Sequence, residues 1–578
     1  MIPYLFRNYI VPFKWRFLLG FALLVGNSYL TSILPVYLMK VVDGGIQSQD
    51  VSRLWIMIGL YVLVFIAYIA SIYIMSVVLE ALGQDILIRL KTDSFIKVLN
   101  WDYKQFTSVS AGKLVTRVEG DAEKVRFFFV TAAVTLLQSL FMLIFMGVIM
   151  FRTNGTMAML IIYPIPLVIG MIVLLQKLIF PLFKKVRRLM AEITSKITEY
   201  LNGLDIIKSY GKEELYFKRF DDDNKKKYFY ERNAEFGWIA FFNFLFMLQE
   251  IIIAMILKSG ASYIVKGLLT YGAMIMFIEY VRMFFFPLIN ISEQISQVQR
   301  SFAAFSRVYD LHTTPVSIQS GDKELKTMTR GIDFKGVSFS YKEGEPVLKN
   351  VSFSLPVGQK WALVGETGGG KSTIVKLLLR FYDIQEGAIT LDGIDIREMN
   401  IQSLRQDIAL IEQDFYLFPA TVLDNIRLFD KSISLGEVQA TCVKIGIDRF
   451  ISTLPRGYET NLHEEGGNLS VGERQLLSIA RAMVKKADLV LMDEATSSID
   501  PHTEKMLEKA MRILMKGRTS LVVAHRLSTV KDADRILVVH QGEIAEHGNH
   551  DALMRKRGLY YHLCQNQLAG PTQEEGEK

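Results

Sequence analysis

The stretch that decides the fold is Gly365-Glu366-Thr367-Gly368-Gly369-Gly370-Lys371-Ser372. It fits the pattern G-x-x-x-x-G-K-[ST], in which glycines let backbone N–H groups close around phosphate oxygens. The apolar run 361–364 before it predicts a buried strand, and 373–379 predicts a helix whose N-terminus adds the positive end of its dipole. We therefore predict a nucleotide site in which Lys371 reaches the β- and γ-phosphates and Ser372 binds Mg²⁺.

Two further apolar runs end in polar residues that suit the same chemistry. The run 489–492 ends in Asp493 and Glu494. Asp493 would hold Mg²⁺ through water, and Glu494 would orient or deprotonate the attacking water. The run 520–524 ends in His525, which would contact the γ-phosphate. Taken alone, these residues also fit a structural interpretation. The neighbouring glycine loop favours catalysis for Asp493 and Glu494, whereas the role of His525 rests mainly on the resemblance described below.

The first half of the chain has the composition of a membrane protein. Half of the 578 residues are hydrophobic, and the net charge is only +7. The lysines and arginines cluster between apolar stretches, so we expect no nucleic-acid partner. Only two cysteines are present, Cys442 and Cys564, which argues against a disulfide framework.

Six stretches before residue 301 are long enough to cross a bilayer, at 17–40, 54–79, 127–151, 157–180, 236–264 and 274–295.

Charge predicts the orientation of these spans. The segments after the second and fourth spans carry most of the lysines and arginines, whereas the opposite loops hold little beyond Arg53, Arg152 and Lys266. We therefore expect a multi-pass protein of the plasma (inner) membrane. The positive-inside rule places both long segments and both termini on the cytoplasmic side. Residues 1–13 predict a short interfacial helix.

The two long charged segments keep a helical spacing of apolar residues. Residues 82–98 and 188–207 therefore predict helices that continue from the membrane into the cytoplasm, with turns at 107–112 and 209–211. The alternative is a solvated charged linker. The polar stretch 321–330 predicts a linker between domains. We expect a membrane domain at 1–320 with two intracellular coupling segments, a nucleotide-binding domain at 321–568 and a flexible tail at 569–578.

The motifs, in this order, resemble those of a half-transporter of the ATP-binding-cassette (ABC) exporter superfamily, over essentially the whole chain. The resemblance implies an α-helical membrane domain of six transmembrane helices with long cytoplasmic extensions, followed by an α/β P-loop ATPase domain that uses ATP and Mg²⁺. It places coupling elements near 101–112 and 210–220. The implied site residues are Tyr341 stacking on adenine, the phosphate loop from Gly365 to Thr373, Gln413 sensing Mg²⁺ and the membrane domain, Ser498 and Asp500 in a loop crossing the dimer interface, and the switch residue His525.

The signature stretch departs from the family pattern L-S-G-G-Q, because it reads Leu469-Ser470-Val471-Gly472-Glu473. In the family, this stretch closes over ATP bound to a second chain, which gives Ser470, Gly472 and Glu473 a place at the nucleotide. A carboxylate at Glu473 suits a helix N-terminus but disfavours a nearby γ-phosphate. We therefore expect a heterodimer with a second, different ABC half-transporter, while a homodimer stays open.

Polar residues within the spans are candidates for the cargo path. Glu250 lies midway along the fifth span, and Glu279 and Arg282 share a face of the sixth, where they could pair. Nearby Met and Phe side chains suit hydrophobic or amphipathic cargo. The structural alternative is a helix-locking pair with ordinary packing around it. Three functions stay open: ATP-driven export of hydrophobic compounds, flipping of a lipid or lipid-linked glycan, and a regulatory protein that transports nothing, against which the complete catalytic set argues. Exporter-shaped importers exist as well.

Overall fold

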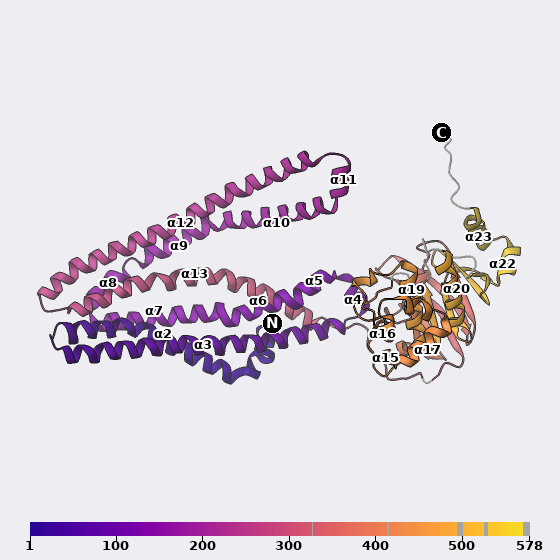
Figure 1. The fold of residues 1–578 in the computed structure, drawn as a ribbon, viewed down its shortest axis with the longest axis horizontal. Coiled ribbons are helices and arrows are strands. Elements are labelled where there is room, and N and C mark those ends of the chain that lie inside the picture. Colours follow the sequence, from indigo (N-terminus) through magenta and orange to yellow (C-terminus); the bar gives the residue numbers. More distant parts are fainter. Residues whose placement is uncertain (326, 413–414, 494–500, 525–529, 570–578) are drawn as a thin grey trace. The chain divides into compact units, whose positions relative to one another are not determined.

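The computed structural model describes the chain except for residues 326, 413–414, 494–500, 525–529 and 570–578 (Figure 1). The chain forms two compact units. The helical unit comprises Met1–Asn100 and Val109–Thr314, and the α/β unit comprises Trp101–Ser108 and Pro315–Lys578. A short piece of the first half of the sequence, residues 101–108, thus belongs to the α/β unit.

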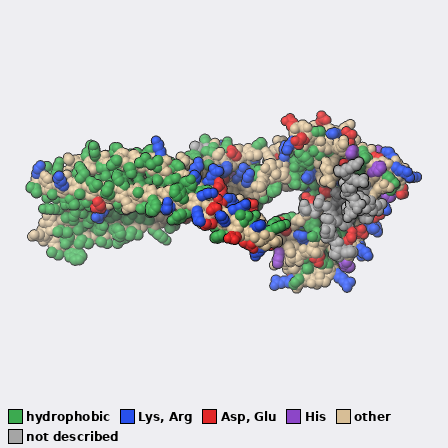
Figure 2. Space-filling model, turned by 90° about the horizontal axis from the view of Figure 1, so that it is seen from above, with side chains coloured by type: hydrophobic (Ala, Val, Ile, Leu, Met, Phe, Trp, Pro, Cys, Tyr) green, Lys and Arg blue, Asp and Glu red, His purple; other side chains and the backbone are tan. Residues whose placement is uncertain are grey.

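Among the described residues, six helical stretches are long and apolar enough to cross a membrane. They confirm the six predicted spans and extend well beyond them. In five of the six, only 11–28% of the most apolar window is buried, as expected for helices solvated by lipid. Figure 2 shows many hydrophobic side chains on the surface at the left end of the molecule. The stretches are Phe6–Ile46, Val51–Leu99, Ala111–Thr153, Gly155–Asn202, Glu213–Val265 and Tyr271–Thr313.

The two long segments predicted to extend beyond the membrane are helical, as predicted, but the second one is broken. Helix α3 (Val51–Leu99) is 49 residues long, far more than the roughly 20 that a bilayer needs. It contains the whole predicted segment 82–98. Helix α10 (Phe180–Asn202) ends at Gly203, and a separate short helix, α11 (Leu204–Ser209), follows. The prediction of one continuous helix over 188–207 is therefore wrong at Gly203, because glycine has a low helix propensity.

The predicted turns and the N-terminal helix are only partly as expected. The turn predicted at 209–211 is present at residues 210 and 211, with Gly211 at φ +57°, whereas Ser209 ends α11. The turn at 107–112 is shorter than predicted, since α4 (Tyr103–Ser108) and α5 (Ala111–Val115) occupy most of it. Residues 1–13 are helical but irregular, with α1 (Ile2–Leu5) followed by π-helical Phe6–Ile10 and 3₁₀-helical Val11–Phe13.

The remaining helices of the helical unit complete the bundle in Figure 1. Third and fourth spans are assembled from several consecutive segments, and prolines at 164 and 181 lie at the breaks of the fourth. The other helices of the helical unit are α2 (Lys14–Val41), η3 (Val42–Ile46), η4 (Thr116–Asp121), α6 (Ala122–Phe127), η5 (Phe128–Ala132), α7 (Ala133–Thr153), α8 (Gly155–Ile162), α9 (Ile165–Leu178), α12 (Glu213–Val265) and α13 (Tyr271–Thr313).

Buried polar side chains connect helices α2, α7 and α13. Asn27 and Ser32 of α2 are fully buried. Gln138 Nε2 of α7 donates to Asn27 Oδ1 at 3.1 Å, and Tyr280 of α13 donates its hydroxyl to the Ser32 carbonyl at 2.7 Å. Such bonds are favourable inside a bundle that lipid surrounds, because an unpaired polar group there would have no water with which to form a hydrogen bond.

In the described part of the α/β unit, strands form two sheets. One is antiparallel, in the order β2-β1-β4-β5, and the other is ordered β10-β9-β3-β8-β7-β6, with β9, β3, β8, β7 and β6 parallel. The strands are β1 (Gly331–Ser340), β2 (Pro346–Pro356), β3 (Lys360–Val364), β4 (Glu386–Leu391), β5 (Ile394–Asp395), β6 (Ile408–Ile411), β7 (Leu489–Asp493), β8 (Thr519–Val523), β9 (Arg535–His540) and β10 (Glu543–Gly548).

Strands β3, β7 and β8 confirm the three strands predicted around the glycine loop, and α14 (Lys371–Leu378) confirms the helix after it. Alternate residues of β3 enter two different cores: Ala362 and Val364 one, Trp361 and Leu363 the other. The other helices are α15 (Ile401–Gln406), α16 (Val422–Arg427), α17 (Leu435–Ile445), α18 (Asp448–Thr453), α19 (Val471–Val484), α20 (Pro501–Met515), α22 (His550–Lys556) and α23 (Leu559–Ala569).

Candidate nucleotide-binding site

The parallel sheet brings the glycine loop and Asp493 to the same edge. Strand β8 lies between β3 and β7, with Val523 paired to Leu363 on one side and to Asp493 on the other. The loop leaves β3 directly after Val364, so both features stand at the carboxyl ends of parallel strands that are separated by β8 alone. This is the edge at which open α/β sheets bind their ligands.

The glycine loop needs its glycines for steric reasons. Gly365 has φ +149°, and a Cβ there would lie 2.1 Å from the Val539 carbonyl oxygen. Gly370 has φ +104°, and a Cβ there would lie 2.7 Å from Leu348 Cδ2. Gly370 is also the N-cap of α14, and no side chain caps that end. The first turn of α14 can therefore offer its amides to an anion.

Lys371 is held over this loop. Its side chain is 6% exposed, and Nζ donates to the carbonyl oxygens of Gly365 at 2.8 Å and Glu366 at 2.7 Å. Burial lowers the pKa of Lys371, while the charges of Asp493 and Glu366 act in the opposite direction. A bound phosphate would add a counter-charge for this buried ammonium, so the site fits an anionic ligand.

Tyr341 follows β1 and lies beside the loop. Its hydroxyl is 3.1 Å from Thr373 Oγ1 on α14. The rings of Phe339 and Tyr382 meet the Tyr341 ring edge-on, with centroids 4.9 and 5.0 Å away. Burial raises the pKa of Tyr341. The hydroxyl of Tyr341 thus lies beside Thr373, the last residue of the phosphate loop, and stacking of its ring on adenine stays a prediction.

The signature stretch forms the start of α19 with a capping box. Ser470 Oγ accepts from the Glu473 amide at 3.3 Å, and Glu473 Oε2 accepts from the Ser470 amide at 2.8 Å. Gly472, which precedes Glu473, is buried, whereas Val471 is 47% exposed. Glu473 therefore has a partner in its own helix. This role was not predicted from the sequence, although Ser-x-x-Glu is the pattern of such a box.

The other expected nucleotide-site residues, Gln413, Glu494, Ser498, Asp500 and His525, lie outside the described residues. In the helical unit, Arg282 Nη1 is 3.2 Å from Glu279 Oε1, so the expected pair on α13 is present. Glu250 is exposed on α12, whose packed side carries the buried residues Leu248 and Ile252.

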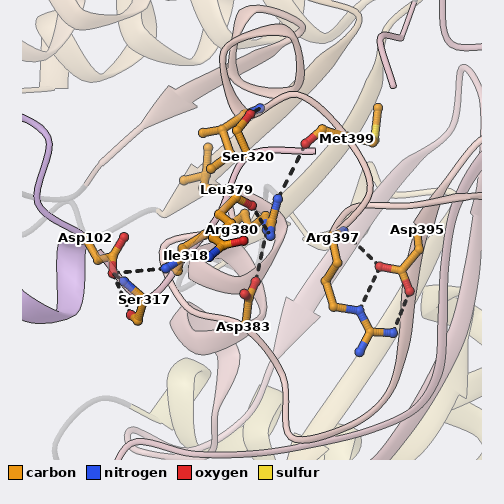
Figure 3. Close-up of polar contacts among 12 residues, drawn as sticks. Asp102, Ser317, Ile318, Ser320, Leu379, Arg380, Asp383, Asp395, Arg397 and Met399 are labelled. Atoms are coloured by element: carbon orange, nitrogen blue, oxygen red, sulfur yellow. Dashed lines mark hydrogen bonds and ion pairs between the residues drawn. The ribbon is translucent and has the colours of Figure 1, made fainter. Parts of the chain in front are cut away.

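Residues 101–108 provide a contact that the sequence did not reveal. Asp102 is 7% exposed, and one of its oxygens, Oδ2, accepts from the amide and hydroxyl of Ser317, both at 2.5 Å, and from the Ile318 amide at 3.1 Å (Figure 3). Tyr103 of α4 stacks on Phe381, with centroids 4.4 Å apart and planes 6° from parallel. Gln105 Nε2 donates to the Pro315 carbonyl at 2.5 Å.

The chain segment that Asp102 contacts is also held from its other end. Arg380 is 3% exposed and donates to the Gln319 carbonyl at 2.8 Å and to Asp383 Oδ1 at 3.0 Å (Figure 3). The connection at 315–320, which leads from the last long helix to β1, is thus fixed between a buried carboxylate and a buried guanidinium. Residues 101–108 of the predicted coupling segment 101–112 are therefore part of the α/β unit, whereas residues 109–112 belong to the helical unit.

Family models match both parts of the chain. The model for the ABC transporter transmembrane region matches residues 17–288, and the ABC transporter model matches residues 348–497. The chain belongs to the ABC transporters. It is a half-transporter of the exporter type, and its α/β unit is an ATPase whose hydrolysis of ATP is coupled to transport.

Relatives of this ABC transporter cover nearly its whole length. The fatty acid ABC transporter ATP-binding/permease protein of Mycobacterium tuberculosis is 32% identical over 91% of this chain and 83% of its own. The multidrug resistance-like ATP-binding protein MdlB of Buchnera aphidicola is 30% identical, with 97% of each chain covered. A solved bacterial Atm1-family ABC exporter with ATP bound is 26% identical, covers 98% of this chain and 99% of its own, and gives a TM-score of 0.77.

Proposed function

We propose that this chain is one half of a dimeric plasma-membrane exporter that moves hydrophobic or amphipathic compounds out of the cytoplasm by alternating access. The observation that carries the proposal is the buried Lys371 above an uncapped helix end, on a chain whose other unit has six membrane-crossing helices. Positive-inside charge supports a cytoplasmic location for both termini and for the ATPase.

In this proposal, ATP binds with Mg²⁺ at the edge of the parallel sheet. Lys371 neutralises charge on the β- and γ-phosphates, and Tyr341 stacks on adenine. Ser372, Asp493 and Gln413 hold the metal, since hydroxyl, carboxylate and amide oxygens are ligands that Mg²⁺ accepts. Glu494 activates the attacking water, and His525 contacts the γ-phosphate.

A second chain completes the site, because the signature of one chain closes over the ATP of the other. We propose a heterodimer in which Glu494 works with the signature of a different half-transporter, and in which Ser470, Gly472, Glu473, Ser498 and Asp500 face that partner. The support is the altered signature beside a retained catalytic carboxylate. The capping box gives Glu473 a structural role in a homodimer as well, so the alternative is a homodimer with two equal sites.

The cargo is proposed to pass Glu250, Glu279 and Arg282. The alternative is a lipid or lipid-linked glycan flippase, which the fatty acid transporter among the relatives favours. An exporter-shaped importer would share the same architecture. Because Glu279 and Arg282 neutralise each other, Glu250 is the member of this set that would favour a cationic cargo.

The test is stimulation of ATP hydrolysis in reconstituted membranes by a panel of cationic drugs, neutral drugs, fatty acids and lipids. The exporter proposal expects stimulation and transport of drug-like compounds, and Glu250→Gln should reduce transport of cations more than of neutral compounds. Stimulation by lipids alone would favour the flippase. Equal transport of both classes before and after Glu250→Gln would remove Glu250 from the cargo path.

A further inference from the structure

A pocket lies where the N-terminal segment meets α3. It has a volume of about 590 Å³, within the range of small-ligand sites. Its lining comes from the end of the irregular N-terminal helix, the start of α2 and one face of α3. The lining residues are Pro12, Phe13, Trp15, Arg16, Asp85, Ile88 and Arg89.

The charge of this pocket is predominantly positive. Arg16 and Arg89 line it, and the single lining carboxylate, Asp85, forms an ion pair with Arg16. Lys14 lies over the Trp15 ring, 5.6 Å from its centroid. Arg89 Nε is 3.9 Å from Asp93 Oδ2, an oxygen that also accepts from the buried Tyr9 hydroxyl at 3.0 Å. Asp93 is thus partly engaged elsewhere, and Arg89 stays 46% exposed.

The apolar lining has the character of a membrane interface. Trp15 is 75% exposed and Ile88 is 63% exposed, and the sequence on both sides of the pocket runs directly into spans of lipid-facing residues. Tryptophan concentrates at the level of lipid head groups, and basic pockets on the cytoplasmic side of a membrane protein bind anionic head groups. Asp85, Ile88 and Arg89 share one face of α3, so cation and apolar surface point the same way.

We propose that this pocket binds the phosphate of an anionic phospholipid from the cytoplasmic leaflet, with Arg89 and Arg16 at the head group and Trp15 and Ile88 at the start of the acyl chains. The inference rests on the cytoplasmic orientation in the proposed function. It needs neither ATP hydrolysis nor a particular cargo, and its test reads lipid binding alone.

The experiment uses the full chain, in the assembly in which it purifies, in nanodiscs of zwitterionic lipid. Phospholipids brominated near the head group quench a nearby tryptophan, so the probe is brominated phosphatidylglycerol compared with brominated phosphatidylcholine. We expect stronger quenching by the anionic lipid, and we expect Trp15→Phe to remove the excess. Equal quenching by the two lipids would overturn the proposal.

Three variants identify the groups involved. Arg89→Gln should weaken binding of the anionic lipid roughly fivefold, the effect of about one cation at an anionic surface. Asp85→Asn should strengthen it, because it frees Arg16 from a competing carboxylate. Arg187→Gln, which removes an exposed arginine of α10, is the matched control and should change nothing. An equal loss with Arg187→Gln, or weaker binding with Asp85→Asn, would contradict the site.

Inorganic phosphate distinguishes a lipid site from a site for the free ion. In detergent, excess phosphate should leave quenching by the anionic lipid nearly unchanged, because the acyl chains contribute apolar contact at Trp15 and Ile88. Full displacement by phosphate would show a free-anion site and would overturn the lipid proposal. Transport failure with intact lipid binding would sink only the proposed function.

Discussion

Two short helices in the first half of the sequence, α4 and α11, differ in what they contact. Helix α4 belongs to the α/β unit, where Tyr103 stacks on Phe381 and the preceding Asp102 accepts three hydrogen bonds. Helix α11 belongs to the helical unit, where Ile206 is 66% exposed and the following Tyr210 is 75% exposed. Both are six residues long and connect long helices.

The difference indicates which of the two helices has its contacts within one chain and which is left exposed. Asp102, Tyr103 and Gln105 in or beside α4 have partners within their own chain. Phe106 of α4 is 48% exposed. The region of α11 presents apolar side chains to solvent, and Phe217 at the start of α12 adds to them at 68% exposed. Exposed apolar side chains of this kind suit a protein interface. We therefore infer that α4 is coupled to its own ATPase and α11 to that of a second chain.

The largest effect should come from blocking ATP hydrolysis, on which transport through both segments depends. Glu494→Gln should lower sustained ATP turnover by ~10²–10⁴-fold, the usual contribution of a general base, and should leave ATP binding intact. Turnover is measured as phosphate release, and binding with a fluorescent ATP analogue. Lys371→Ala is the contrasting variant, since it deletes a phosphate contact and should weaken binding itself. Near-normal turnover in Glu494→Gln would disprove the assignment.

A smaller effect should follow from loosening α4 alone. Asp102→Asn replaces a buried charged acceptor of three hydrogen bonds, each worth about 1.5–3 kcal/mol when the acceptor is charged. We expect cargo transported per ATP to fall about tenfold, the equivalent of about 1.4 kcal/mol, while basal hydrolysis persists.

Asp322→Asn is the control for Asp102→Asn, because it changes an exposed carboxylate near the same connection. It should leave the transport ratio unchanged. An unchanged ratio in Asp102→Asn, or equal losses in both variants, would show that the hydrogen bonds to Ser317 and Ile318 do not serve coupling.

The aromatic contact of α4 should be measurable by a double-mutant cycle. Tyr103→Ala, Phe381→Ala and the double variant should give a coupling free energy of about 0.5–1.5 kcal/mol in thermal or denaturant unfolding of the α/β unit. Tyr103→Phe should keep the stack and serve as the conservative control. Strict additivity of the two alanine variants would mean that the rings do not stabilise each other.

The smallest effect should come from the signature helix. Glu473→Gln keeps a residue that can complete a capping box and removes only its charge at the helix N-terminus, so unfolding should become easier by about 0.3–1 kcal/mol. If the heterodimer proposal is correct, the same change should alter nucleotide retention more than turnover. A change in turnover with unaltered retention would favour two equivalent sites.

The sequence was sufficient wherever a pattern is local. The spacing of glycines and Lys371 predicted the loop and its strand and helix, and runs of apolar residues predicted six spans. The pairing of Glu279 with Arg282, three residues apart on one helix, is equally local. The role of Glu473 was also readable locally, since the Ser-x-x-Glu pattern of a capping box is present. The prediction considered only how the charge of Glu473 would repel a bound phosphate.

Contacts between distant residues could not be predicted from the sequence. Asp102 and Ser317 are 215 positions apart, and nothing in either stretch indicates the other. The pocket at Arg16 and Arg89 likewise depends on how the N-terminal segment packs on α3. Gly203 marks an intermediate case, since a glycine inside an apolar periodicity can be tolerated or can end the helix, and here it ends α10.

The most direct test of the difference between α4 and α11 is photo-crosslinking from a single site in each. The photoreactive p-benzoylphenylalanine is placed at Tyr210 or, separately, at Tyr103, in membranes of cells that make the full transporter, and products are sized and identified after irradiation. We expect a two-chain product from position 210, whose identity shows a second copy or a different half-transporter, and only internal crosslinks from position 103. Internal products alone from position 210, or a two-chain product mainly from position 103, would contradict it.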